Sequence, residues 1–386
     1  MYSRFLEYIK NMSCIRKIAI WGAGDLSSVA EDILNQLSIS DYIYIDSNRD
    51  KQNKLYKEKK VIAPEMISKN YYILVSTVFF PEISADLHIK GYRDLEDYVS
   101  VLEPEYYEAL IKNDKAPRVP EINVDILNNL ERDLRVNTVC EDVDWFDEEE
   151  FIEYEKSLGF IETYKKAYDL IWEQKPYSRY RRKIMEYYFV DKLLGFDQWD
   201  RGDIYLDLGA QTSPFAKYLR EKRKIEAYGI DLEKSIYADL GYYLQEDATN
   251  THFCNESVLG MSIQSAYECF IGDADIRLIK EAARILKPTG KLVVIPLYMH
   301  EQYLSTLSPT YYGKGTADKG SLECIRKDCR GDLAIGRFYD MAALKRRVLD
   351  VAKQCGLEAK IYIIPNKFVE CDSFVYLKFI LVLQKQ

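Results

Sequence analysis

Short apolar runs separated by polar segments of helical character fill the first third of the chain. Residues 17–22 form the first run, and residues 42–46 and 71–77 repeat the pattern. Between the first two runs, the segment 27–37 carries apolar side chains at helical spacing. Strands that alternate with helices are typical of a parallel sheet. We therefore expect a small Rossmann-like α/β domain over residues 1–115.

The pattern becomes irregular and mostly helical over residues 116–200. Pro117 and Pro120 mark a break in the chain. The acidic run 141–150 is typical of a solvated helix start or a linker, and the segment 178–196 has the pattern of an amphipathic helix. We expect a helical linker or cap in this region.

A second series of strands and helices begins at residue 204 and predicts a larger α/β domain over residues 201–386. Two further strand-like runs close the chain after the last helix. The strands and helices expected before them are the strands 204–210, 226–232, 258–263 and 291–297 and the helices 273–287 and 341–356.

Composition narrows the classes of function. The chain has 386 residues, of which 30% are charged, and a net charge of −9. Proteins that bind nucleic acid generally neutralise phosphates with a basic surface, so this acidic balance argues against a nucleic-acid partner. The first residues lack the apolar core of a signal peptide, and no apolar stretch is long enough for a membrane span. We expect a globular protein of the cytoplasm.

Eight cysteines are spread along the chain rather than grouped. This spacing fits free thiols in a reducing compartment better than a set of disulfides. Cys324, Cys329, Cys355 and Cys371 match the spacing of structural zinc ligands only loosely, and no histidine supports them. We therefore expect no metal site.

The second series carries acidic residues where its strands end. A nucleoside cofactor bound to a doubly wound sheet needs a tight turn after the first strand and a carboxylate at the end of the second. Asp207 and Gly209 end the first strand, and Asp231 ends the next, 22 residues after Gly209. Asp247 and Ala248 follow the third strand-like segment. The sequence therefore predicts a nucleoside site at this edge.

These segments resemble a known family. LDLGAQTSPFA, YGIDLE, QEDAT and EAARILKPTGKLVVIPLYM look like the successive signatures of class I methyltransferases that depend on S-adenosyl-L-methionine (SAM). The resemblance covers about 180 residues and implies a seven-stranded sheet with SAM as the cofactor. The turn of this chain has Gln211 and Ser213 where the family usually has its second and third glycines.

The resemblance also implies which residues hold the cofactor. Asp207 and Gly209 would lie beside the methionine part, and Asp231 would hold the ribose. Asp247 and Ala248 would face the adenine, with Gln264 near the sulfonium. The full set of implied cofactor contacts is Asp207, Gly209, Ala210, Gln211, Asp231, Leu232, Asp247, Ala248 and Gln264.

Methyl transfer to a hydroxyl group requires a residue that removes the proton, usually a histidine or a carboxylate. His300 and Glu301 follow the fifth strand, at the edge where ligands bind in open α/β sheets, and Glu268 begins the helix after the fourth strand. These three residues are the acid–base candidates, although an exposed loop position is the simpler explanation of His300. The long polar loop 308–332 has the length of a lid or a substrate-recognition insert.

Four further residues are candidate contacts for a carbohydrate or phosphate. They lie in or just after the loop 308–332 and are Tyr311, Tyr312, Arg330 and Arg337.

The N-terminal segment shows a second, incomplete dinucleotide motif. IAIWGAGDLS is followed by YIYID, so that Asp46 lies 24 residues after Gly22, and Ser27 stands where the third glycine would be. The segment resembles the small Rossmann-like domains attached to sugar-modifying enzymes of polysaccharide biosynthesis, which bind nucleotide-sugars. The alternative is a nucleotide-free scaffold used for packing or for formation of a homodimer.

Three hypotheses follow. The leading one is a SAM-dependent methyltransferase that acts on a sugar, a nucleotide-sugar or a related small polar metabolite, with O-methylation favoured. The second is a non-catalytic binding or scaffold protein made of two degenerate Rossmann-like domains, since both glycine turns are substituted. The third is a sugar-nucleotide enzyme whose chemistry resides in the N-terminal domain.

Overall fold

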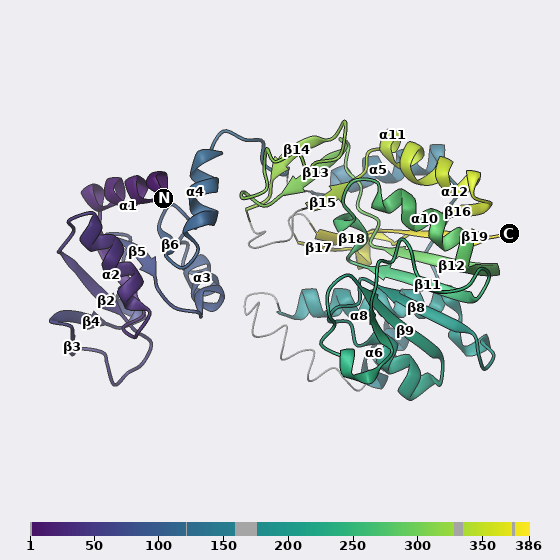
Figure 1. Cartoon of the computed structure of the whole chain (residues 1–386), viewed down its shortest axis with the longest axis horizontal. Helices are drawn as coiled ribbons and strands as arrows, with labels where there is room; N and C mark the ends of the chain where they lie inside the picture. The colour runs from purple at the N-terminus through teal and green to yellow at the C-terminus, as the bar shows by residue number, and fades with distance from the viewer. Residues whose placement is uncertain (1, 121, 159–175, 328–334, 373–374) are drawn as a thin grey trace. The chain divides into compact units, whose positions relative to one another are not determined.

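The computed structural model describes residues 2–120, 122–158, 176–327, 335–372 and 375–386 (Figure 1). The chain divides into two compact units. The N-terminal unit runs to Ala116, and the C-terminal unit begins at Pro117 and contains the end of the chain. No helix within these described residues is long and apolar enough to cross a lipid bilayer.

A mixed sheet forms the centre of the N-terminal unit. In its described residues the sheet has six strands in the order β3-β4-β2-β1-β5-β6, and only the β3–β4 pair is antiparallel. The chain moves outward from β1 to β4 and then returns to the other side of β1, so the strand order reverses between β1 and β5. The strands are β1 (Lys17–Trp21), β2 (Tyr42–Ile45), β3 (Leu55–Tyr56), β4 (Lys59–Ile62), β5 (Tyr71–Val75) and β6 (Tyr98–Ser100).

Helices cover this sheet and bury its central strand on both faces. Residues 18–21 of β1 are all buried, as expected for a parallel strand between two helical layers. Phe80 of α3 packs in a core cluster with Ala19 and Ile73, and Phe5 of α1 stacks on Tyr107 of α4. The helices are α1 (Ser3–Ile15), α2 (Ser27–Gln36), α3 (Phe80–Ile89) and α4 (Pro104–Lys112).

The C-terminal unit contains a larger sheet. Over the described residues its strand order is β10-β9-β8-β11-β12-β19-β16-β7, and β19 alone runs antiparallel to its neighbours. The strands are β7 (Cys140–Asp142), β8 (Ile204–Leu208), β9 (Glu226–Asp231), β10 (Tyr243–Gln245), β11 (Val258–Gln264), β12 (Leu286–Ile295), β16 (Leu357–Ile363) and β19 (Phe379–Lys385). The predicted α/β class is confirmed in both units.

One strand of this sheet comes from the predicted linker. β7 pairs in parallel with β16 at the edge of the sheet. The rest of the acidic run is a helix start, as expected, because the Asp147 side chain accepts a hydrogen bond from the Glu150 N–H at the beginning of α6 (Glu148–Ser157). β7 was not predicted because three residues with two exposed acidic side chains give no strand pattern.

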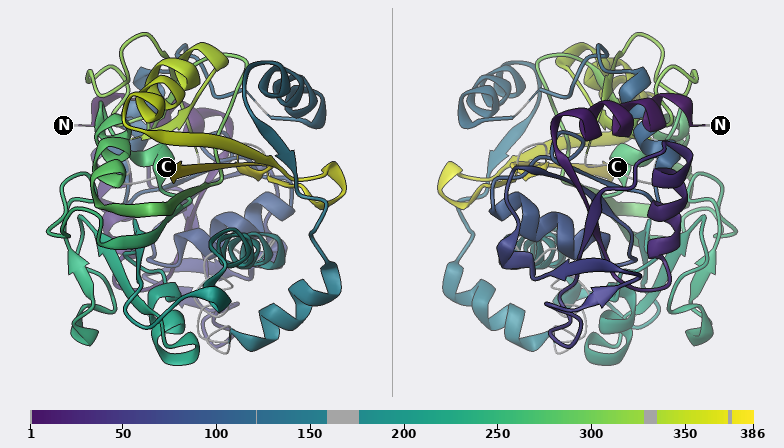
Figure 2. Two further views of the ribbon diagram at one scale, coloured as in Figure 1. Left: turned by 90° about the vertical axis from the view of Figure 1, so that its right-hand side faces the viewer. Right: turned by 90° about the vertical axis from the view of Figure 1, so that its left-hand side faces the viewer.

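Two helical layers enclose the larger sheet (Figures 1 and 2). Leu130 of α5 and Leu278 of α10 belong to one continuous core with the sheet, and helices α11 and α12 join the same core through Leu344 and Ala352. Aromatic side chains of α8 pack elsewhere, with the Tyr187 ring stacked 4.6 Å from that of Phe215. These helices are α5 (Val124–Asn137), α8 (Pro176–Leu194), α9 (Phe215–Tyr218), α10 (Ala274–Ile285), α11 (Met341–Leu344) and α12 (Asp350–Gln354).

A small separate sheet follows β12 in the chain. In the described residues its order is β14-β13-β15, with β13 (Leu304–Leu307), β14 (Leu322–Ile325) and β15 (Ile335–Phe338). A hairpin of β17 (Glu370–Asp372) and β18 (Val375–Leu377) precedes β19. The predicted polar loop 308–332 therefore includes the strand β14.

Buried ion pairs fasten the small sheet to the helices. Arg337 of β15 is fully buried and donates its Nε to Asp318 Oδ2 at 2.5 Å and its Nη2 to Asp318 Oδ1 at 2.9 Å. Arg347 makes the same two-point contact with the buried Asp275 of α10, at 2.9 and 2.7 Å. Arg337 also lies 3.4 Å from Asp275, so the four residues form one network.

The burial of Arg337 corrects one prediction. Arg337 was a candidate substrate contact, but its guanidinium is saturated by Asp318 and by the Gly272 carbonyl and has no exposed surface. Tyr311 and Tyr312 are half-buried in the loop. Arg330 lies outside the described residues.

We predict that Arg337→Leu destabilises the fold strongly. Removing one partner of a buried ion pair leaves an uncompensated charge and costs about 3–5 kcal/mol. Lys345, whose ion pair with Asp350 is exposed, is the matched control, and Lys345→Leu should change stability by less than about 1 kcal/mol. Urea unfolding followed by circular dichroism measures both effects; equal midpoints for the two variants would contradict the structural role of the network.

Candidate active site

A sharp turn follows β8 at the carboxyl edge of the larger sheet. Gly209 has a φ of +72°, and a Cβ at this position would lie 2.6 Å from Cβ of Ala266. Only glycine fits both constraints without strain. The Gly209 and Ala210 N–H groups donate to the Ile230 carbonyl at 2.8 and 3.1 Å, which joins the turn to the end of β9.

Asp231 lies beside this turn, where the sequence placed it. Its Oδ2 accepts a hydrogen bond from the Gln211 N–H at 3.0 Å, and its Oδ1 accepts one from the Glu233 N–H at 2.9 Å. Gln211 makes this contact through its main chain, while its side chain is exposed. A carboxylate can accept about four hydrogen bonds, which leaves capacity for the two hydroxyls of a ribose.

Apolar and polar groups suited to a purine flank Asp231. Leu232 is 67% exposed although it is a large apolar residue, and it offers a surface on which a base can pack. Ala248 is buried, and Asp247 is exposed with its Oδ1 bound to the N–H and hydroxyl of Thr249, both at 2.8 Å. These residues follow β9 and β10, which are adjacent strands.

Asp207 is buried at the end of β8. Its Oδ2 accepts a hydrogen bond from the Ser213 hydroxyl at 2.6 Å. Burial raises the pKa of Asp207 to about 6, and the negative charges of Asp231 and Glu186 add to this effect, while the Ser213 hydrogen bond and the Lys183 ammonium oppose it. Asp207 therefore stabilises the turn through Ser213 in a site of low polarity.

Gln264, at the end of β11, holds a buried oxygen atom that has no partner among the described residues. Its Nε2 donates to the Ser262 hydroxyl at 2.7 Å, whereas Oε1 is buried and accepts no hydrogen bond there. A buried acceptor without a donor is costly, so this atom is suited to receive a donor from a ligand.

Two charged residues of α8 also belong to this edge, and sequence analysis missed them. Lys183 Nζ donates to the Gln264 carbonyl at 3.0 Å and to Glu186 Oε2 at 2.8 Å, and Ser265 donates to Glu186 Oε1 at 2.7 Å. Glu186 is fully buried. The sequence does place a basic and an acidic residue three positions apart on an otherwise apolar helix face, which is unusual. Their partners, however, are distant in the sequence and could not be inferred from it.

Glu268 lies in the same electrostatic environment. It is half-buried, and its Oε2 is buried without a hydrogen-bond partner among the described residues. Burial raises the pKa of Glu268 to about 7, and the charge of Glu186 adds to the rise. A hydrogen bond from its own backbone and the charges of Arg326 and Lys183 oppose it. A carboxylate with such a pKa can take up a proton near neutral pH.

His300 and Glu301 lie after β12 in different surroundings. His300 is buried, its Nδ1 accepts a hydrogen bond from the Gln302 N–H at 3.0 Å, and burial lowers its pKa. Within the described part of the chain its Nε2 has no partner. Glu301 is exposed and accepts a hydrogen bond from Asn129 of α5 at 3.2 Å. The exposed loop position that was the simpler expectation for His300 is therefore wrong, because its ring is buried.

The described residues contain no group of three or more histidine, cysteine or acidic side chains arranged to hold a metal ion. Cys324 and Cys355 are free thiols. Cys329 lies outside the described residues, and so does the side chain of Cys371.

Comparison with known proteins identifies the class. A family model for a methyltransferase domain matches residues 206–294, from β8 to β12. None of the curated proteins matches the chain significantly.

Three methyltransferases are among the solved structures that match the chain. A SAM-dependent methyltransferase from Methanosarcina mazei is 17% identical, with 50% of this chain and 96% of that chain covered and a TM-score of 0.35. The 1,6-didemethyltoxoflavin N1-methyltransferase of Burkholderia thailandensis is 13% identical, with 61% and 89% covered and a TM-score of 0.37. The geranyl diphosphate C-methyltransferase of Streptomyces coelicolor is 13% identical, with 54% and 79% covered and a TM-score of 0.35.

The C-terminal unit is thus a class I methyltransferase domain, in agreement with the expectation from sequence. The chain therefore carries a SAM-dependent methyltransferase domain, and SAM is the methyl donor of this class. This match favours the methyltransferase hypothesis over the hypothesis of a non-catalytic scaffold for the C-terminal unit.

Asp207 predicts how stability depends on pH. Because its pKa is raised from 3.8 to about 6 in the folded protein, its contribution to stability is complete below about pH 3.8 and is lost as pH rises through about 6. Relative to Asp207→Asn, the wild-type chain should lose about 3 kcal/mol of unfolding free energy across this window.

Urea unfolding of both proteins at pH values from 4 to 8 measures this difference. The exposed Asp239 is the control, and Asp239→Asn should leave a constant offset across the range. A constant offset for Asp207→Asn as well would show that Asp207 titrates normally.

Proposed function

We propose that the protein transfers a methyl group from SAM to a sugar, a nucleotide-sugar or a related small polar metabolite, with oxygen favoured as the methylated atom. The observation that carries this proposal is the pair of charged side chains on the sheet edge beside Gln264, Lys183 and Glu268, of which Glu268 has a carboxylate oxygen with no hydrogen-bond partner among the described residues. Such groups suit an acceptor rich in hydroxyls, because they supply both donors and acceptors of hydrogen bonds. The resemblance of the N-terminal unit to domains of polysaccharide biosynthesis supports the same class of acceptor.

The residues at the carboxyl edge fit the cofactor. Asp231 would accept hydrogen bonds from both ribose hydroxyls, and Leu232 would pack on the adenine together with Ala248 and Asp247. Gln264 Oε1, the buried acceptor without a partner, would receive the ammonium of the methionine part. The turn Gly209–Gln211 and Asp207 would border that same part. When bound, SAM supplies a methyl group on a positively charged sulfur.

We assign the removal of the acceptor proton to Glu268. Its raised pKa of about 7 makes it a better base than an ordinary carboxylate, and its Oε2 is not engaged by other described residues. His300 is the second candidate because its neutral ring has an unpartnered Nε2. Glu301 is exposed and bonded to Asn129, so we expect it to support the loop.

We predict that Asp231→Ala weakens binding of S-adenosylhomocysteine by roughly 10- to 100-fold, because two hydrogen bonds to a carboxylate are lost. Isothermal titration calorimetry on the full chain measures the affinity. Asp239→Ala, a change of an exposed acid in the same segment, should bind normally. Unchanged affinity in Asp231→Ala would remove Asp231 from the cofactor site.

A second prediction concerns Glu268. With an acceptor from a panel of sugars and nucleotide-sugars, kcat should rise with pH around a value of about 7 and then level off, because Glu268 must be ionised to accept the proton. Glu268→Gln should lower kcat by roughly 10²–10⁴-fold and abolish this rise.

Release of S-adenosylhomocysteine gives the rate in each case. Glu301→Gln should retain the wild-type profile. If His300→Gln removes the pH dependence and Glu268→Gln keeps it, then His300 is the base and the assignment to Glu268 is wrong.

A further inference from the structure

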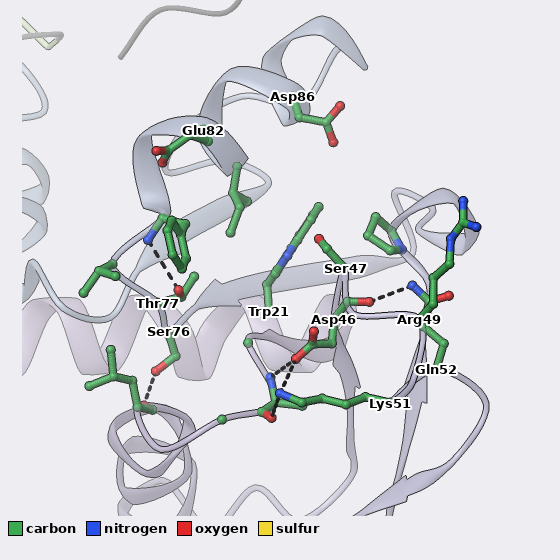
Figure 3. Close-up of a pocket in the computed structure, with 18 of the residues that line it drawn as sticks. Trp21, Asp46, Ser47, Arg49, Lys51, Gln52, Ser76, Thr77, Glu82 and Asp86 are labelled. Carbon is green, nitrogen blue, oxygen red and sulfur yellow. Dashed lines mark hydrogen bonds and ion pairs between the residues drawn. The ribbon is translucent and has the colours of Figure 1, made fainter. Parts of the chain in front are cut away.

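The N-terminal unit contains a large cavity that is lined by residues of this unit. Its volume is about 960 Å³, within the usual range for ligand sites. The cavity lies over the carboxyl ends of β1, β2 and β5, where the strand order of the sheet reverses (Figure 3). Open α/β sheets bind their ligands at such points. The lining includes Gly22–Leu26, Asp46, Arg49, Lys51, Phe79 and Glu82.

The walls of this cavity repeat the geometry of the cofactor edge in the C-terminal unit. Gly22 has a φ of +115°, a Cβ there would lie 2.9 Å from the Ser76 carbonyl oxygen, and its N–H donates to Ile45 at the end of β2. Asp46 Oδ2 accepts a hydrogen bond from the Ala23 N–H at 3.0 Å, and Oδ1 accepts one from the Asn48 N–H at 2.8 Å.

The corresponding bonds of Asp231 come from the Gln211 N–H at 3.0 Å and the Glu233 N–H at 2.9 Å. In both units, therefore, an aspartate at the end of the second strand accepts two main-chain hydrogen bonds. One comes from the turn after the first strand, and the other comes from the N–H of the residue two positions after the aspartate. This arrangement presents the remaining carboxylate lone pairs toward the ligand side, where vicinal hydroxyls can donate to them.

The two sites differ in charge. Lys51 Nζ lies 3.2 Å from Asp46 Oδ2 and donates to the Ala23 carbonyl at 2.7 Å, so the Asp46 charge is largely compensated. Arg49 is exposed and lines the cavity nearby. Figure 3 shows Arg49 and Lys51 on the β2 side, apart from Glu82 and Asp86 on α3. The whole lining has five acidic side chains against three basic ones, so the cavity is cationic only locally, where Lys51 and Arg49 lie beside Asp46. An anionic group of a ligand would bind on that side. No lysine forms an ion pair with Asp231 among the described residues.

We propose that this cavity is a second ligand site, for a ribonucleotide that carries a diphosphate. The ribose hydroxyls donate to Asp46, and the Lys51 ammonium, on a side chain 40% exposed, turns from Asp46 toward the phosphates beside Arg49. Phe79, which is 63% exposed and lines the cavity, offers an apolar face to the base. The residues of this site belong to the N-terminal unit, whereas those proposed for SAM belong to the C-terminal unit.

Calorimetry on the full chain tests the proposal with ADP, UDP, UDP-glucose and adenosine as probes. At least one diphosphate should bind, and Asp46→Asn should weaken it at least about 10-fold, whereas Asp50→Asn, a change of an exposed neighbour outside the cavity lining, should not. Lys51→Met should weaken the diphosphates and leave adenosine unchanged. The comparison of UDP with UDP-glucose distinguishes a free nucleotide from a nucleotide-sugar.

S-adenosylhomocysteine binding provides the control for folding. It should be unchanged in Asp46→Asn, and diphosphate binding should be unchanged in Asp231→Ala. The proposal is overturned if no diphosphate binds at about 1 mM, if Asp46→Asn binds as the wild type does, or if Asp231→Ala abolishes the binding, because the nucleotide would then occupy the cofactor site. Failure of this test leaves the methyltransferase assignment intact, since that assignment is measured with a different ligand.

Discussion

Three hydrogen bonds join the turn after β8 to the end of β9, and the one made by a side chain runs from the Gln211 N–H to the Asp231 carboxylate. The turn after β8 and the end of β9 are neighbours in space, although Gln211 and Asp231 are 20 residues apart in the sequence. The Asp231 carboxylate binds the Gln211 N–H, and the Ser235 hydroxyl donates a hydrogen bond to the Gln211 carbonyl at 2.7 Å. Both main-chain groups of Gln211 are therefore held by residues that follow β9. Because the main chain makes the contact, a glutamine at this position is compatible with the turn.

Electrostatics distinguishes the two nucleoside-type edges of the chain. The C-terminal edge gathers Asp207, Glu186 and Glu268 in a poorly solvated region with Lys183 as their close cation, and burial raises the pKa of both Asp207 and Glu268. Such an excess of carboxylates favours a positively charged ligand. In the N-terminal unit Lys51 forms an ion pair with the corresponding carboxylate, so the same turn geometry has different local charge surroundings in the two units.

Local patterns were sufficient to predict some features and not others. The strands from β8 to β12 and the position of Asp231 follow from apolar runs that end in a glycine or an acid, and these signals lie within a few residues. The role of Glu186 could not be predicted, because its partner Ser265 lies 79 residues away. Arg337 was misjudged for the same reason: its neighbours in sequence suggest a polar loop, and only the folded chain brings Asp318 and Asp275 around it.

The strand β7 has a consequence for the autonomy of the methyltransferase unit. The segment that matches the family runs from residue 206 to 294, whereas β7 completes the far border of the sheet from residues 140–142 and α8 supplies Lys183 and Glu186 from before β8. A fragment truncated just before β8 would leave the backbone of β16 open to pairing with other chains, since unprotected sheet borders promote aggregation. Residues 206–294 alone are therefore not expected to form a stable domain.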